Sequence, residues 1–158
     1  MQQNNRFYKD LYPNIDDLVI TKAVEIRPDC VYVELLEYGN MRGMIGLKDI
    51  SERRLRSIKK IISIGKIYPL LVINVDEDKK YIDLSNKYIT EKDTALDKYN
   101  KFKILYNIVS CTSYELNKNK DSTEILINLL EKTLWKFEKD KCFEIFYSIK
   151  ENNEKINI

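Results

Sequence analysis

The side chains with the most distinctive chemistry lie together in one polar segment of the sequence. Ser51 and Glu52 are followed by three arginines within four positions, Arg53, Arg54 and Arg56. Guanidinium groups bind phosphate and carboxylate oxygens, so the segment could contact nucleic acid, although such a run is also common on a solvated face. The residue pattern by itself favours Ser51 as the N-cap of a helical turn that begins at Glu52.

Catalytic and metal chemistry have little support in the composition. The 158 residues contain no histidine, which excludes Ser-His-Asp and Cys-His catalytic sites and the usual zinc sites. Three cysteines, Cys30, Cys111 and Cys142, are far apart in the sequence and are expected to be reduced, mostly buried thiols. Because there is also no Gly-rich phosphate loop and no metal-ligand cluster, we predict that the chain is not an enzyme and needs no cofactor or metal.

Net charge and hydropathy limit the partners that the chain can have. The formal net charge is only +2, so any contact with nucleic acid must come from a local patch. The first residues lack an apolar signal region, and no apolar stretch approaches membrane-spanning length. We therefore expect a soluble, cytoplasmic protein without membrane contact.

The sequence from Leu18 to Ser85 is typical of short β-strands. Runs of β-branched and aromatic residues alternate with turn residues such as Gly39 and Asn40, which tolerate positive φ angles. The runs cover residues 18–26, 30–36, 42–46, 68–75 and 80–85. Five short strands with one longer connection predict an OB-type β-barrel, a fold that binds oligonucleotides.

Helical spacing appears in the long connection and after the barrel. Leu55, Ile58 and Ile62 fall on one helical face, which predicts a helix within residues 51–62. Further amphipathic helices are predicted at 90–109, 121–137 and 141–151. The expected fold is thus α+β, with an N-terminal arm (1–13), an OB-fold RNA-binding barrel (14–88) and a helical domain with a frayed tail (89–158).

Several segments, in their order and spacing, are similar to the alpha subunit of eukaryotic translation initiation factor 2. They are Phe7-Tyr8, Leu35-Leu36-Glu37-Tyr38, Gly43-Met44-Ile45, Arg53-Arg54, Arg56-Ser57-Ile58 and Tyr81-Ile82-Asp83-Leu84-Ser85. The resemblance covers almost the whole barrel and continues more weakly to the region of Trp135. It implies a barrel of the ribosomal-protein-S-one type followed by a helical domain.

The resemblance also implies a role in translation initiation. The alpha subunit belongs to the complex that brings initiator tRNA to the ribosome, and stress-responsive kinases phosphorylate a serine in its barrel loop. The matching phosphoacceptor is Ser51, in a loop with Glu52, Arg53, Arg54 and Arg56. The phosphorylated family member blocks its nucleotide-exchange factor, which makes that factor a possible partner. The family's third domain, which binds the gamma subunit, has no counterpart in the sequence, so gamma binding is not expected.

A second segment resembles the part of the alpha subunit on which the kinases dock. It includes Lys79, Lys80, Tyr81 and Asp83. Lys80 stands where the family has glycine, and a lysine adds bulk and charge beside this surface. Taken as barrel residues alone, Tyr81 is an ordinary strand residue and Asp83 faces solvent.

Contact with RNA is expected through aromatic rings and basic side chains on the barrel. The candidates are Tyr32, Tyr38, Arg42, Arg53, Arg54, Arg56, Lys59 and Lys60.

Three functions are compatible with the sequence. The first is a translation-factor subunit, or part of one, that is controlled through Ser51. The alternative is a pseudosubstrate or competing substrate that inhibits the kinases and spares the authentic alpha subunit. A generic single-stranded RNA-binding barrel is the third, but it leaves the alpha-subunit-like segments unexplained.

Overall fold

A computed structural model describes residues 6–52, 57–116 and 122–136 of the chain. The chain divides into two compact units, Met1–Tyr99 and Asn100–Ile158. The predicted domain boundary at residue 88 stays a prediction, because the last strand ends at Ser85 and the following helix runs across the division at Tyr99.

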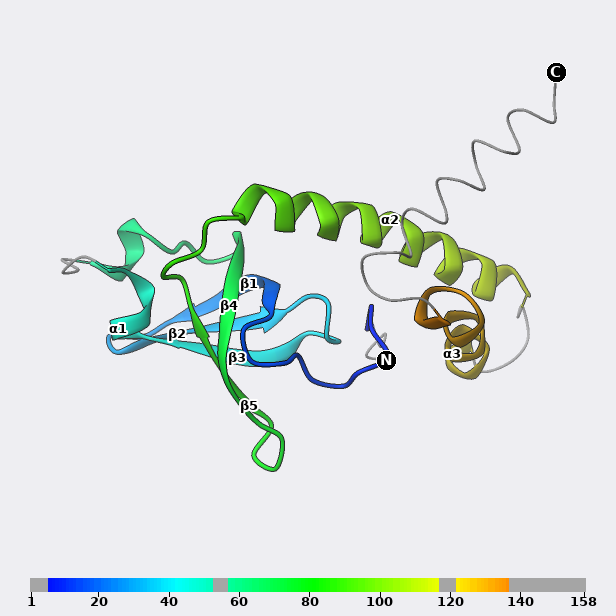
Figure 1. The fold of residues 1–158 in the computed structure, drawn as a ribbon, viewed down its shortest axis with the longest axis horizontal. Coiled ribbons are helices and arrows are strands. Elements are labelled where there is room, and N and C mark those ends of the chain that lie inside the picture. The colour runs from blue at the N-terminus through cyan, green and yellow to red at the C-terminus, as the bar shows by residue number, and fades with distance from the viewer. Residues whose placement is uncertain (1–5, 53–56, 117–121, 137–158) are drawn as a thin grey trace, which may run out of the picture. The chain divides into compact units, whose positions relative to one another are not determined.

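The first unit contains five strands that form a closed barrel (Figure 1). They are β1 (Leu18–Ile26), β2 (Cys30–Leu35), β3 (Met41–Gly46), β4 (Ile67–Asp76) and β5 (Tyr81–Ser85). The order around the barrel is β1-β2-β3-β5-β4, and β4 pairs with β1 to close it. All neighbours are antiparallel except β3 and β5, which are parallel. The predicted α+β fold with an OB-type barrel is confirmed.

Strand alternation decides which side chains fill the barrel. Val31, Val33 and Leu35 of β2 are completely buried, whereas the intervening Tyr32 and Glu34 are only half-buried. Because successive residues of a strand point to opposite faces, the first set forms the core and the second set lies on the outer surface.

The predicted turn between β2 and β3 is confirmed. Gly39 and Asn40 have φ angles of 66° and 59°, and the Met41 amide donates to the Tyr38 carbonyl over 3.2 Å. Two consecutive positive φ angles match the right-handed twist of a hairpin.

The N-terminal arm docks on the barrel through its aromatic rings. Phe7 is buried, and its ring stacks on that of Tyr99 with 5.7 Å between centroids. The Tyr8 ring packs against Tyr38 with a centroid distance of 5.4 Å. The Tyr8 hydroxyl donates to Glu37 Oε1 over 2.8 Å, so the arm reaches a carboxylate that is itself buried.

The long connection between β3 and β4 differs from its prediction. It contains the one-turn helix α1 (Leu47–Ile50) and the 3-10 helix η1 (Ile58–Lys60). Glu52 is a bend and does not begin a helix, and the predicted residues 53–56 lie outside the described structure. Ile58 and Ile62 are nevertheless buried in the barrel core. Their spacing therefore reflects contacts with the core and not a regular helix.

The remaining described residues form the helices α2 (Lys92–Leu116) and α3 (Ser122–Lys132) and the 3-10 helix η2 (Leu134–Lys136). Within the second unit, the buried side chains recur at helical spacing: Phe102, Leu105, Tyr106, Val109, Leu130 and Leu134. Cys111 is exposed, contrary to the expectation of a buried thiol, whereas Cys30 is buried. The helix predicted at 141–151 lies outside the described residues, as does Cys142.

Candidate nucleic-acid interface

A β-bulge near the end of β1 determines which residues face outward there. Ala23 pairs with Val33, but the next paired residue of β1 is Glu25, opposite Tyr32. The extra residue, Val24, shifts the alternation of side chains by one position. As a result, Glu25 lies beside the outward-facing Tyr32 instead of pointing into the barrel.

Four side chains then meet on the outer surface of β1, β2 and β3. Glu25 Oε1 accepts from Arg27 Nε, and Glu25 Oε2 accepts from Arg42 Nη2, each over 2.8 Å. The guanidinium carbons of Arg42 and Arg27 lie 4.1 and 4.9 Å from the centroid of the Tyr32 ring. We call Glu25, Arg27, Tyr32 and Arg42 the arginine–tyrosine cluster.

The cluster is charged and accessible to solvent. The hydrogen bond from Arg27, followed by the charges of Arg27 and Arg42, lowers the pKa of Glu25 below its ordinary value despite some desolvation. The side chains of Arg27, Arg42 and Glu25 are 52%, 58% and 42% exposed. Exposed ion pairs contribute little to stability, so a ligand with its own anionic groups can compete for these arginines.

The outer face continues from the cluster to β5. Met44 of β3 pairs with Tyr32 on one side and with Asp83 on the other. The Tyr81 hydroxyl lies 2.9 Å from the sulfur of Met44, and Asp83 accepts a 3.2 Å hydrogen bond from the Asn74 amide group. Residues proposed for RNA contact and residues proposed for kinase docking therefore share one surface of the barrel.

The structure corrects one proposed RNA contact. Tyr38 is only 3% exposed and packs into the core against Tyr8. Burial raises the pKa of its hydroxyl, with further contributions from nearby carboxylates. A ring in this position cannot stack on a base, because the arm covers it.

Ser51 lies where α1 ends, with extended backbone angles of φ −153° and ψ 148°. The segment around it is attached to the residues that follow β5. The Asn86 amide group donates to the Ile50 carbonyl over 3.1 Å, and the Glu52 carboxylate accepts from the Tyr88 amide over 3.3 Å. The Ser51 side chain itself is half-buried. Arg53, Arg54 and Arg56 lie outside the described residues.

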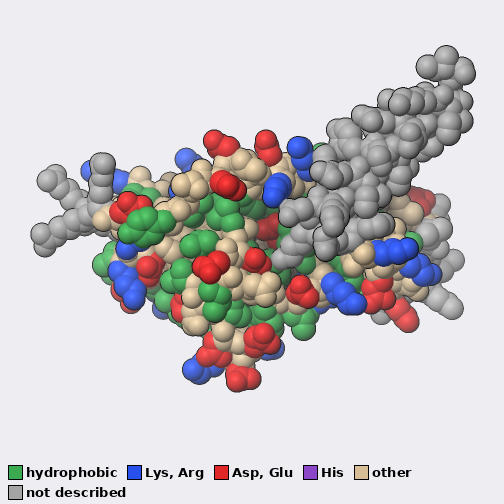
Figure 2. All heavy atoms as spheres, viewed as in Figure 1, with side chains coloured by type: hydrophobic (Ala, Val, Ile, Leu, Met, Phe, Trp, Pro, Cys, Tyr) green, Lys and Arg blue, Asp and Glu red, His purple; other side chains and the backbone are tan. Residues whose placement is uncertain are grey.

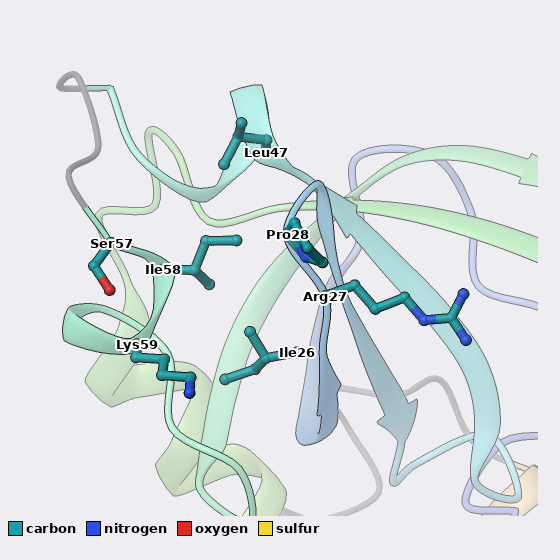
Figure 3. A pocket seen from close by; sticks show the side chains of 7 residues that line it. All are labelled: Ile26, Arg27, Pro28, Leu47, Ser57, Ile58 and Lys59. Carbon is teal, nitrogen blue, oxygen red and sulfur yellow. The ribbon is translucent and has the colours of Figure 1, made fainter.

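A pocket of about 500 Å³ lies between the β1–β2 turn, the start of α1 and η1 (Figure 3). Its lining residues are Ile26, Arg27, Pro28, Leu47, Ser57, Ile58 and Lys59. The Arg27 guanidinium extends away from Ile26 and Ile58, in keeping with its pairing to Glu25. Lys59 therefore supplies the basic group of this pocket, and Lys60 is exposed on the same turn.

Among the described residues, no three acidic or cysteine side chains gather in a way that could hold a metal ion. Within the same residues, every helix is too short or too polar to traverse a lipid bilayer.

Comparison with known proteins identifies the barrel and the family. Residues 12–87 match the S1 RNA binding domain. A translation initiation factor 2 subunit alpha homolog from Arabidopsis thaliana is 41% identical over 106 residues, which are 66% of this chain and 31% of the relative. Translation initiation factor 2 subunit 1 from Dictyostelium discoideum is 38% identical over 132 residues, or 82% of this chain and 38% of the relative.

Over the matched region, this chain belongs to the translation initiation factor 2 alpha-subunit family. It spans about a third of the length of the curated relatives that it matches.

Solved structures agree with the alpha-subunit fold. The intact archaeal alpha subunit from Pyrococcus abyssi has a TM-score of 0.66 and 19% identity, covering 77% of this chain and 45% of that one. The alpha subunit from Pyrococcus horikoshii, solved in a complex with aDim2p and rRNA, has a TM-score of 0.60 and 22% identity. The match covers 69% of this chain and 66% of the archaeal chain. At these identities the likeness establishes the fold.

One departure from the alpha-subunit pattern has a visible structural effect. Lys80, which the family resemblance places at a glycine position, has a φ angle of 53° at the tip of the β4–β5 hairpin. Its amide closes the turn by donating to the Glu77 carbonyl over 3.3 Å. A left-handed conformation is costly for a residue with a Cβ atom and easy for glycine. Figure 2 shows acidic and basic side chains together at this tip, where Lys79 pairs with Asp76.

Replacing Lys80 with glycine is expected to raise the free energy of unfolding by about 0.5–1 kcal/mol, because the relief of left-handed strain exceeds the added flexibility of the unfolded chain. Urea denaturation followed by circular dichroism measures the change. Lys79→Gly is the matched control, since it removes the ion pair with Asp76, keeps the hydrogen bond from the backbone amide to Asp76 and relieves no positive φ. Equal stability changes in both variants would contradict the prediction.

The sequence missed two members of the arginine–tyrosine cluster in this alpha-subunit-type barrel. Glu25 falls within the predicted strand 18–26, and Arg27 follows this strand without a predicted role. Their spacing does not place them beside Tyr32 unless the bulge at Val24 is known.

Proposed function

We propose that this chain acts in translation initiation in the cytoplasm, as an alpha-subunit-type protein that contacts initiator tRNA and the ribosome through its barrel. The observation that carries this proposal is the arginine–tyrosine cluster on the outer face of an S1 barrel. OB-type barrels bind oligonucleotides with the face of strands 2 and 3 and the adjoining β1–β2 and β4–β5 loops. Here that face carries Tyr32, Arg42 and Met44, and the β1–β2 turn carries Arg27.

The face combines the two kinds of group that single-stranded RNA requires. An aromatic ring offers a platform for a base, and guanidinium groups pair with backbone phosphates. The relatives are named as subunits of an initiation factor, which favours a binding function over catalysis. The archaeal relative solved with rRNA gives one example of an alpha subunit next to RNA.

Replacing Tyr32 with alanine is expected to weaken binding of single-stranded RNA about tenfold, because stacking contributes about 1–3 kcal/mol per base. Fluorescence anisotropy with a labelled 12-nucleotide RNA, and separately with initiator tRNA, measures the dissociation constants. Tyr114→Ala is the control, because Tyr114 is an exposed tyrosine on α2. RNA binding that is equal in the two variants would contradict the proposed interface.

Regulation through Ser51 is the second part of the proposal. Three features support it: the extended backbone, the position directly after α1, and the basic residues that follow in the sequence. A phosphate on Ser51 would carry a charge of about −1.5 to −2, and Arg53, Arg54 and Arg56 follow it closely in the sequence. The modified loop would then be read by a partner, for which the nucleotide-exchange factor is the candidate that the family resemblance implies.

Ser51→Ala is expected to abolish phosphate incorporation by an activated stress-responsive kinase, because no other hydroxyl occupies the acceptor position. Stoichiometric labelling of the wild-type chain is measured by mass spectrometry. Ser57→Ala is the matched control, since Ser57 is a half-buried serine of the same connection. Labelling that persists in Ser51→Ala would remove Ser51 as the acceptor.

The same assay tests the inhibitor alternative. Tyr81 and Asp83 lie on the outer face of β5 beside the exposed Lys79 and Lys80, so a kinase could engage this surface without using Ser51. A competing substrate would be labelled and would also suppress phosphorylation of the authentic alpha subunit in the same reaction, whereas a pseudosubstrate would suppress that phosphorylation while it remains unlabelled. Suppression without labelling would replace the regulated translation-factor function with the inhibitor function.

A further inference from the structure

We infer that Glu25 occupies, in the free protein, a phosphate-binding subsite formed by Arg27 and Arg42. RNA binding would exchange this carboxylate for a backbone phosphate, and the arginines would shift with the phosphate so that a base can reach the Tyr32 ring. The inference rests on the proposed RNA-binding function and deepens it, because it names an internal group that competes with the ligand.

The carboxylate matches a phosphate in both charge and hydrogen bonding. Each Glu25 oxygen accepts one guanidinium N–H, one from Arg27 and one from Arg42, both over 2.8 Å. Two oxygens of a backbone phosphate can accept the same pair of donors. The space between the two arginines is therefore an anion site, and the protein's own carboxylate fills it.

The arginines also cover the surface that a base would use. Arg42 lies 4.1 Å and Arg27 lies 4.9 Å from the centre of the Tyr32 ring. A base can stack on this ring only where a guanidinium has moved aside. All three charged side chains are substantially exposed, and exposed pairs are weak. RNA, which carries one anionic phosphate per nucleotide, can thus displace Glu25.

The backbone places Glu25 in this competing position. Without the extra residue at Val24, the alternation from Ala23 would turn Glu25 inward, toward the core. Bulges commonly re-aim a side chain in this way. Glu34 lies on the same outer face, opposite Arg42 in the β2–β3 register. Among the described residues, no ion pair joins Glu34 to an arginine.

This contrast supplies a matched pair of variants. Glu25→Gln and Glu34→Gln each remove one negative charge from the same face, but only the first frees the two arginines. We expect Glu25→Gln to bind the 12-nucleotide RNA roughly 3- to 10-fold more tightly than the wild type. Glu34→Gln should change the affinity less than twofold. Adding Tyr32→Ala to Glu25→Gln should remove most of the gain.

An RNA-free measurement separates this inference from the proposed function. Inorganic pyrophosphate is titrated while the Nε–Hε signals of Arg27 and Arg42 are followed by NMR. The signals should shift at lower pyrophosphate concentration in Glu25→Gln than in Glu34→Gln or the wild type. A thermal melt followed by circular dichroism checks that all variants remain folded.

The outcomes are distinct. Equal RNA affinity and equal pyrophosphate response in the two glutamine variants would overturn the inference while leaving RNA binding intact. Weaker RNA binding by Glu25→Gln would also overturn it, since Glu25 would then support the ligand and not compete with it. A stronger pyrophosphate response in Glu25→Gln, with no RNA binding by any variant, would support the subsite and count against the RNA-binding function.

Discussion

Replacing Gly43 with alanine is expected to lower the free energy of unfolding by about 2 kcal/mol, in the range typical of overpacked cores. Gly43 is in β3, where an added Cβ atom would lie 2.8 Å from Leu84 Cδ1 and 2.9 Å from Leu35 Cδ1. Both leucines are completely buried, so neither can rotate into solvent. The Ile82 carbonyl oxygen, at 3.3 Å from the added Cβ atom, belongs to the backbone and can move away even less than the leucine side chains.

The loss of stability should be specific to Gly43, where β3 packs closely against β5. Gly46, at the end of the same strand, would place a Cβ atom no closer than 3.6 Å to Asp49, and its φ angle of −69° suits any residue. Gly46→Ala should therefore leave stability nearly unchanged in urea denaturation. Shortening Leu84 to valine should restore part of the stability of Gly43→Ala. Equal stability of the two alanine variants would show that β3 and β5 adjust without cost.

Removing the Glu37 carboxylate has the second large expected effect, a loss of about 3 kcal/mol in Glu37→Ala, because buried donors to a charged acceptor lose their partner. Glu37 is 5% exposed. Its Oε2 accepts from the Ile20 backbone amide, and its Oε1 accepts from the Tyr8 hydroxyl, both over 2.8 Å. Burial, and then the charge of Glu37, raise the pKa of Tyr8 above its ordinary value, so this phenol stays protonated and donates.

Two milder variants divide the loss between the arm and the strand. Tyr8→Phe keeps the ring packed on Tyr38 and removes only the hydroxyl, so it should lose about 1 kcal/mol. Glu37→Gln retains an oxygen that can accept from the Ile20 amide. Its loss in free energy of unfolding should therefore lie between the losses of Tyr8→Phe and Glu37→Ala. Chemical denaturation gives the stabilities, and limited proteolysis reports release of the arm. A stable Glu37→Ala variant with a docked arm would be inconsistent with this account.

The sequence predicted the strands well because their signals are local. Each strand begins or ends within one residue of the run of β-branched and aromatic residues that predicted it. The positive φ angles at Gly39 and Asn40 fall where turn chemistry places them. These features depend on neighbouring residues and need no knowledge of distant contacts.

The site depended on distant contacts, and there the sequence was less informative. The one-turn helix α1 is held by Asn86, which donates to the carbonyls of Asp49 and Ile50. Tyr38 was expected at the surface, but Tyr8 of the arm covers it. Glu25 entered the interface because one extra residue in β1 changed the direction of its side chain. Periodicity cannot reveal a shift that arises only when two strands pair.

The strand order also determines when the barrel can close during synthesis. β1, β2 and β3 follow one another and pair as local hairpins, but closure requires Leu18 to pair with Leu71 and Met44 with Asp83. Non-local pairings of this kind slow folding. Until Ser85 has left the ribosome, β1 and β3 present unpaired edges, which can associate with strands of other chains. Association of these edges before the barrel closes would then lower the yield of folded barrel in a cell.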